Sequence, residues 1–394
     1  MGFRHRFAPH MTKMEAEQII SLQPKPGEDG FIDFAADYPA VDLLPKKDIV
    51  GITNTLLKKS FSEIVQSGSA EGYRPARAAM AKMIARHGLS PKEDEIIVTS
   101  GSLRAIDLIC KLFIEPGDVA LVEAPTYSGA LQVFRSHRAQ AIHLISDGDG
   151  PIPEDLERKL NIFAPKIVYL NPTFKNPSGA VISPERRRIA AEMTGRSDVL
   201  LIEDDPFGDF RYKGEQLPPI KSFDGAGNVV YIASASHILG PGMRVGAAYM
   251  PAELVRAAAA AMRVSDMHAS VLPQAVFAEY AERGFIDLHI SGYRAVYKDK
   301  LNIAMKMIRD FFPGDVKVSE PSGGIFIWCE CPAGVDSDEV LERAVKEKVA
   351  FASGRQFYCN GDGRNAFRIN FACAANPDIT KGLEILGGLL RGAT

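Results

Sequence analysis

Residues 229–246 read VVYIASASHILGPGMRVG, so an apolar run leads directly into polar and glycine-rich turns. The run at 229–233 is typical of a strand that is buried on both faces. Similar runs occur at 95–99 (EIIVT), 119–123, 166–170 (KIVYL) and 199–202 (VLLI). They alternate with segments that have helical periodicity. The pattern therefore predicts an α/β fold with a mostly parallel sheet between helices.

The same periodicity predicts the order of the domains. Helices are expected at 76–87, 102–113, 127–136 and 184–193, and a long helical pattern runs over about 274–312. From about residue 316 short strands and helices alternate again, which suits a smaller α/β domain. We expect an N-terminal arm (1–40) that packs with the small domain, a large domain (41–290) and a small C-terminal domain (291–394).

Composition limits the class of protein. The chain has 394 residues and a net charge of -3, so no basic field favours nucleic acid or an anionic membrane. No stretch approaches the roughly 20 apolar residues that a membrane helix needs. The five cysteines are too scattered for a disulfide scaffold, and Cys329-x-Cys331 has no second pair with zinc spacing. We expect a cytoplasmic protein without a metal site.

Ligands of such sheets bind beyond the carboxyl ends of the strands. Ser100-Gly101-Ser102 follows the run at 95–99 and opens a helix, where free N–H groups and the helix dipole favour an anion such as phosphate. An ordinary N-cap serine would explain the same residues.

Two further strand ends carry polar residues. Glu203, Asp204 and Asp205 follow the run at 199–202, and buried acids are costly unless a positive group lies near them. They could also cap a loop or pair with arginines. After 229–233 come serines, glycine turns and Arg244, which again suit a phosphate. The glycine spacing there is GxGxxxG, so it is weak evidence for a dinucleotide site.

In this order, the segments resemble class I and II aminotransferases, fold-type I enzymes that use pyridoxal phosphate (PLP). The aminoadipate-aminotransferase type and the catalytic half of MocR-like regulators are the most similar. The resemblance runs from Ile32-Asp33-Phe34 to the last helix. It implies a large PLP-binding domain, a small C-terminal α/β domain, a homodimer, and an amino acid or keto acid as substrate.

The resemblance also implies roles for single residues. Tyr127 should stack on the cofactor ring, Asn176 should bind its 3'-oxygen, and Asp204 should pair with its ring nitrogen. Arg368 should hold the substrate carboxylate, with Tyr38 and Asn176 beside the substrate. The phosphate should be bound by Ser100, Gly101, Ser102, Ser234, Ser236 and Arg244.

The chain departs from the family pattern around the cofactor. His237 stands where the family has the lysine that forms a Schiff base with PLP. Imidazole cannot form that stable link, but it can transfer protons. Phe207 replaces a tyrosine that contacts the ring 3'-oxygen, and Ser67 replaces one that reaches across the dimer. Lys175, next to Asn176, is a candidate to replace the missing lysine.

Three functions stay open at this stage. The first is an enzyme that holds PLP or its amine form (PMP) non-covalently and performs transamination or a related reaction at Cα, Cβ or Cγ. The second is a conventional aminotransferase in which His237 is an engineered change. The third is a non-catalytic binding protein; about 30 residues before the fold are too few for a winged-helix DNA reader, and the charge is not basic.

Overall fold

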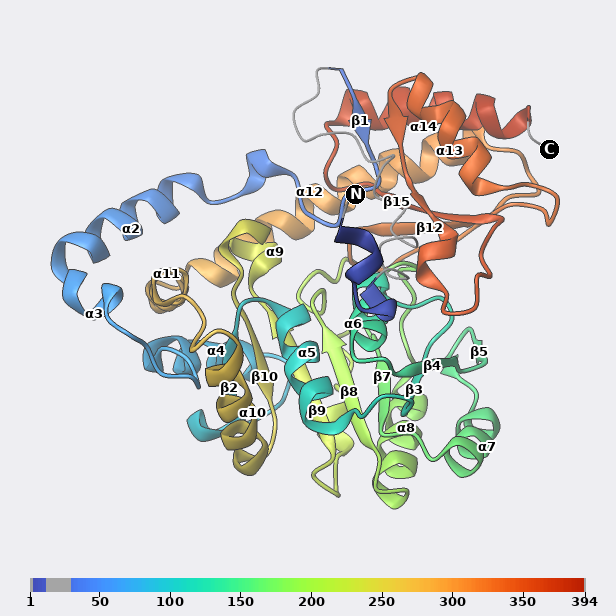
Figure 1. The fold of residues 1–394 in the computed structure, drawn as a ribbon. Helices are drawn as coiled ribbons and strands as arrows, with labels where there is room; N and C mark the ends of the chain where they lie inside the picture. Colours follow the sequence, from blue (N-terminus) through green and yellow to red (C-terminus); the bar gives the residue numbers. More distant parts are fainter. Residues whose placement is uncertain (1–2, 12–29, 393–394) are drawn as a thin grey trace.

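The structure is a computed structural model that describes residues 3–11 and 30–392 (Figure 1). Within these residues the larger sheet has seven strands in the order β2-β10-β9-β8-β7-β3-β4. Only β10 runs antiparallel to its neighbours. The strands are β2 (Ile96–Thr99), β3 (Val119–Val122), β4 (Gln140–His143), β7 (Ile167–Leu170), β8 (Leu200–Asp205), β9 (Val229–Ser234) and β10 (Gly246–Tyr249).

Helices cover both faces of this sheet, because successive strand residues point to opposite sides and both sides are apolar. In β8, for example, Leu200 and Ile202 pack into one buried cluster and Leu201 into another. One face carries α5 (Ser102–Phe113), α6 (Ser128–Ser136) and α10 (Ala252–Ser265). The other carries α4 (Arg74–Ala85), α7 (Pro153–Phe163), α8 (Pro184–Arg196) and α11 (Val271–Glu282).

A smaller antiparallel sheet forms the upper right of Figure 1. Within the described residues its order is β11-β12-β15-β14, with β11 (Lys317–Val318), β12 (Phe326–Glu330), β14 (Ala352–Ser353) and β15 (Ala366–Asn370). Helices α13 (Ser337–Lys346) and α14 (Asn376–Arg391) lie with it, and β1 (Ile32–Asp33) pairs with β13 (Val349–Ala350) in parallel. The fold class predicted from the sequence, including the smaller C-terminal α/β part, is therefore confirmed.

Some segment limits differ from the prediction. The expected helical pattern at 274–312 is two helices, α11 and α12 (Phe285–Phe311), because Gly284 takes a left-handed conformation (φ 72°) between them. The domain limit expected at 290/291 falls inside α12. It stays a prediction, as does the limit at residue 40. Residues 1–2 and 12–29 of the expected arm lie outside the described residues.

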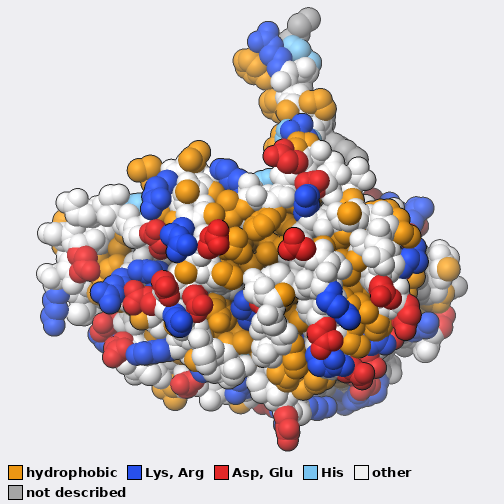
Figure 2. Space-filling model, turned by 90° about the horizontal axis from the view of Figure 1, so that it is seen from below, with side chains coloured by type: hydrophobic (Ala, Val, Ile, Leu, Met, Phe, Trp, Pro, Cys, Tyr) orange, Lys and Arg blue, Asp and Glu red, His pale blue; other side chains and the backbone are white. Residues whose placement is uncertain are grey.

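The remaining helices are α2 (Lys46–Lys59) and α3 (Phe61–Val65), which extend to the left in Figure 1. A short helix, α9 (Ser236–Leu239), follows β9. In the described chain no helix is long and apolar enough to span a bilayer. On the face seen in Figure 2, Lys and Arg side chains are interspersed with Asp and Glu, so this face carries no field of one sign.

Candidate active site

A pocket of about 250 Å³ lies beyond the carboxyl ends of β7, β8 and β9. Most residues predicted from the sequence meet in it, although they come from segments spread over the whole chain. Those that line it are Tyr38, Ser102, Tyr127, Asn176, Asp204, Phe207, Ser234, Ser236, His237 and Arg244. Ser100, Gly101, Lys175 and Arg368 do not line it.

Ser100 and Gly101 lie directly behind one end of the pocket. Gly101 precedes α5 with φ 92°, and a Cβ atom there would lie 2.2 Å from the Arg244 Nη2 atom. Arg244 donates from Nη2 to the Ser100 carbonyl oxygen at 3.1 Å. Glycine therefore lets the guanidinium pack against the turn that begins α5. This combines an arginine with a helix N-terminus, which is an arrangement suited to phosphate.

Ser234 and Ser236 line the same pocket. The Ser236 backbone N–H donates to the Ser234 Oγ atom at 3.2 Å. The Ser236 Oγ atom is buried and has no hydrogen-bond partner among the described residues. A buried hydroxyl without a partner is costly, so this atom suits a ligand oxygen.

Asp204 lies inside β8. The strand runs on to Asp205, whereas the sequence placed the three acids after a strand that ended at 202. The carboxyl groups of these three acids are buried, and each accepts hydrogen bonds from side-chain or backbone donors. The Tyr169 hydroxyl, for example, donates to the Asp204 Oδ2 atom at 2.7 Å. Apolarity alone therefore underestimated the length of the strand.

The other carboxyl oxygen of Asp204 is the clearest sign of a missing ligand. Among the described residues its Oδ1 atom finds no hydrogen-bond partner, and the residue is only 1% exposed. Burial, with a smaller contribution from Asp205, raises the pKa of Asp204 to about 7. A protonated ring nitrogen would give Oδ1 a partner and would restore the charged carboxylate. The site therefore fits the cofactor that the resemblance implies.

Asn176 and Tyr127 line the pocket near Asp204. The Asn176 backbone N–H donates to the Asn171 Oδ1 atom at 3.1 Å, and the Asn171 side chain donates to the Asp204 carbonyl oxygen at 2.8 Å. Tyr127 packs over Gly129, where a Cβ atom would lie 2.5 Å from the tyrosine Cζ atom. The backbone at Asn176 and the ring of Tyr127 are thus held by their surroundings.

His237 lies in α9 and packs against Phe207, with ring centroids 4.4 Å apart. Its Nδ1 atom is buried and has no hydrogen-bond partner in the part of the chain that the structure describes. Burial lowers the pKa of His237 to about 4, although the charge of Asp37 opposes this. The imidazole is therefore neutral at pH 7 and can accept a proton. A phenyl ring at 207 gives the imidazole an apolar neighbour.

Lys175 is not brought to the pocket with the other predicted residues. Its ammonium group forms an ion pair with the buried carboxylate of Glu123. Breaking a buried ion pair is strongly unfavourable, so the lysine is held away from the ligand. Its predicted catalytic role stays a prediction.

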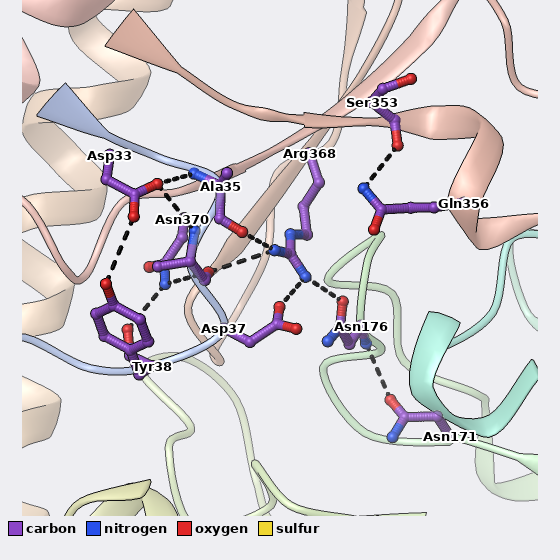
Figure 3. Close-up of polar contacts among 11 residues, drawn as sticks. Asp33, Ala35, Asp37, Tyr38, Asn171, Asn176, Ser353, Gln356, Arg368 and Asn370 are labelled. Atoms are coloured by element: carbon purple, nitrogen blue, oxygen red, sulfur yellow. Dashed lines mark hydrogen bonds and ion pairs between the residues drawn. The ribbon is translucent and has the colours of Figure 1, made fainter. Parts of the chain in front are cut away.

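Arg368, in β15, lies just beyond the pocket and contacts two of its lining residues. Its Nη1 atom donates to the Asn176 Oδ1 atom at 2.7 Å and also pairs with the Asp37 carboxylate. Figure 3 shows the guanidinium pointing between these two side chains. Its Nη2 atom donates to the Ala35 carbonyl oxygen at 2.5 Å. The guanidinium also lies over the Phe326 ring, 4.3 Å from its centroid.

The sequence did not point to Asp37, Tyr169 or a role for Asn171. Tyr169 stands in an apolar strand, where it looked like core. Asn171 directly follows that strand, and this position was the available signal. Asp37 is next to Tyr38 but 331 positions away from Arg368 in the sequence, so only the fold reveals its contact with Arg368. Within residues 3–11 and 30–392 no three His, Cys, Asp or Glu side chains are grouped to hold a metal ion.

The family model for aminotransferase class I and II matches residues 45–386. Aromatic-amino-acid aminotransferase 1 from Thermococcus litoralis is 33% identical, and the match covers 99% of this chain and 95% of that protein. A multiple substrate aminotransferase from Thermococcus profundus superposes with a TM-score of 0.93 at 32% identity, over 100% of this chain and 99% of that one. An alpha-aminoadipate aminotransferase from Thermus thermophilus, complexed with N-(5'-phosphopyridoxyl)-L-leucine, gives 0.92 at 30% identity, with the same coverage.

Proposed function

Because the chain belongs to the aminotransferase class I and II family, we propose that it is a PLP-dependent enzyme of amino acids in which His237 replaces the Schiff-base lysine. The cofactor, as PLP or PMP, is then held by non-covalent contacts. The observation that carries the proposal is the imidazole of His237, buried and without a described partner at Nδ1, in the same pocket as the unpaired carboxyl oxygen of Asp204.

The described contacts support separate roles for the pocket residues, which would bind the phosphate, the ring or the substrate. The turn at Ser100–Ser102 and the side chains of Ser234, Ser236 and Arg244 suit the phosphate. Asp204 suits the ring nitrogen, while Tyr127, Asn176 and Phe207 suit the ring and its 3'-oxygen. Arg368 and Tyr38 remain for the substrate. Arg368 suits a carboxylate because its Nη1 atom, which pairs with the Asp37 carboxylate, can donate to a substrate carboxylate in its place.

Each polar residue has a simple task in this proposal. When bound, the cofactor supplies an electron sink for the electron pair released at the substrate Cα. Asp204 keeps the ring nitrogen protonated, because an ionised carboxylate next to it favours the charged ring. His237 accepts the Cα proton, since its imidazole is neutral above pH about 4. Arg368 would hold the substrate carboxylate.

The chemistry after proton removal is either transamination or another reaction at Cα, Cβ or Cγ. Exchange of the substrate Cα proton in D₂O, followed by NMR on PLP-loaded protein, tests the proposed base. Exchange should be readily measured in the wild type and should fall by about 100-fold or more in His237→Gln. Unchanged exchange in His237→Gln would refute the role of His237.

The variant His237→Lys separates this proposal from a conventional aminotransferase that carries an engineered histidine. A native histidine predicts that lysine lowers turnover, even if it forms a covalent link with PLP. An increase in turnover by orders of magnitude would instead indicate a conventional aminotransferase whose native residue at position 237 is lysine. A protein that binds PLP and amino acids but turns over none, with either residue, would be a non-catalytic binding protein.

We also propose that the enzyme is a homodimer. Arg244, assigned to the phosphate, is exposed in the single chain, and a partner subunit would cover it. Ser67 would not supply the tyrosine contact that the family pattern has across the dimer. Sedimentation of the purified protein would test this, since a monomer at micromolar concentration would contradict it.

A further inference from the structure

Asp37 occupies the side of Arg368 that a substrate carboxylate would use. Its carboxylate pairs with the Arg368 Nη1 atom, and its side chain lines the pocket. The side chain of Arg368 is 2% exposed, whereas that of Asp37 is 50% exposed. The buried cation is therefore neutralised by an acid that reaches the pocket.

The backbone around Asp37 is held firmly. The Asp33 carboxylate accepts from the backbone N–H groups of Ala35 and Ala36, at 2.8 and 3.2 Å. The Asn370 side chain donates to the carbonyl oxygens of Ala36 and Tyr38, both at 2.9 Å. Figure 3 shows these contacts on the chain that passes Arg368. A ligand can therefore displace the Asp37 side chain more easily than the segment that carries it.

Charge then decides which substrate gains from this displacement. In the proposed assignment Asp204 pairs with the ring nitrogen and Arg244 with the phosphate, so among the residues that line the described pocket Asp37 is the charged one left, with Arg368 as its partner. When an α-carboxylate takes Arg368, Asp37 keeps its negative charge without that partner. A second carboxylate on the substrate would be repelled by it, and a cationic group would be attracted.

We propose, on the basis of the function proposed above, that Asp37 is a specificity-determining residue that holds Arg368 in the free enzyme and then becomes the counter-ion of a cationic substrate side chain. The favoured substrates are amino acids with a basic side chain, and dicarboxylic amino acids are disfavoured. Because Asp37 is half exposed, solvent screens its charge, and we expect a preference of about tenfold.

Three inert amino acids with different side-chain charges test this on the PLP-loaded protein. They are α-methyl-L-lysine, α-methyl-L-leucine and α-methyl-L-glutamate, which lack the Cα proton, and binding is measured by calorimetry. In the wild type the lysine analogue should bind about tenfold more tightly than the glutamate analogue. In Asp37→Asn the glutamate analogue should bind about threefold more tightly and the lysine analogue about threefold more weakly than in the wild type, so the preference should vanish.

The matched control is Asp42→Asn, which removes the same charge from an exposed position nearby in the chain that does not line the pocket. It should keep the wild-type order of the three analogues. An order unchanged in Asp37→Asn, or a wild type that prefers the glutamate analogue, would overturn the role of Asp37 and leave the proposed function standing. Binding of none of the analogues by either protein would refute the proposed function, and with it this inference.

Discussion

Replacing Asp204 with asparagine should make the cofactor-free protein more stable and its cofactor affinity weaker. The carboxyl group is buried with one unpaired oxygen, and burial raises its pKa from 3.8 to about 7. A group whose pKa is higher in the folded state binds more protons there than in the unfolded chain. Its contribution to stability is therefore fully present below pH about 3.8 and is lost as the pH rises through 7.

The size of this loss follows from the pKa difference. At about 1.36 kcal/mol per pKa unit, the full loss is about 4 kcal/mol, of which about 2.5 kcal/mol falls between pH 5 and pH 8. Asparagine does not ionise and still offers an oxygen to the Tyr169 hydroxyl. The free energy of unfolding of Asp204→Asn, relative to the wild type, should thus rise by about 2.5 kcal/mol between these two pH values.

Urea unfolding of the cofactor-free proteins at pH 5 and pH 8 measures this difference. Titration with PMP should show the opposite effect, because a hydrogen bond between charged groups contributes about 1.5–3 kcal/mol. The Kd for PMP should increase by about 10- to 150-fold. A cofactor-free Asp204→Asn protein that is less stable at pH 8, or that binds PMP as tightly as the wild type, would refute the reasoning.

Glu203→Gln is the matched control on the same strand. Burial also raises the pKa of Glu203 to about 7, but its two carboxyl oxygens accept backbone N–H groups from Ile220 and Lys221, each at 2.8 Å. Glutamine would turn an N–H₂ group toward one of these donors. This variant should keep the wild-type affinity for PMP, because Glu203 does not line the pocket.

Three other changes have defined outcomes. Gly101→Ala should cost about 1–3 kcal/mol, because φ is 92° and the new methyl group would meet Arg244, and fluorescence titration should show weaker PLP binding. Lys175→Met should lower stability by about 3–5 kcal/mol in thermal unfolding, since it leaves the buried Glu123 carboxylate without its ion-pair partner; an unchanged Tm would contradict this. Burial lowers the pKa of His237 to about 4, so Cα-proton exchange should be independent of pH above about 5 and should fall through pH 4 as the imidazole becomes protonated.

The fold could largely be predicted from the sequence because its strands are buried on both faces and are therefore continuously apolar. β10 was missed, since its four residues, Gly246–Tyr249, are mostly small and carry little strand signal. The break at Gly284 was also missed, because helical periodicity continues on both sides of it. The periodicity of apolar residues does not show where one helix ends and the next begins in a new direction.

The pocket could be predicted in part, for a similar reason. Residues at strand ends, such as Asp204 and Ser234, are brought together by any parallel sheet of this order. Asp37 belongs to the segment that follows β1, and β1 pairs with β13. No sequence pattern around Asp37 indicates its contact with Arg368. The ion pair of Lys175 with Glu123 joins segments that follow β7 and β3, two strands that are neighbours in the sheet but not consecutive in the sequence.

The most direct test of the central claim is mass spectrometry of the PLP-loaded protein after borohydride reduction and proteolysis. With His237 in place of the lysine, we expect the protein to bind PLP, to release it on dialysis, and to yield no peptide in which PLP is attached to a lysine. The cofactor-bound protein should also lack the absorbance at about 420 nm that a Schiff base with lysine gives. A stable pyridoxyl adduct on Lys175, or on any other lysine, would contradict the account.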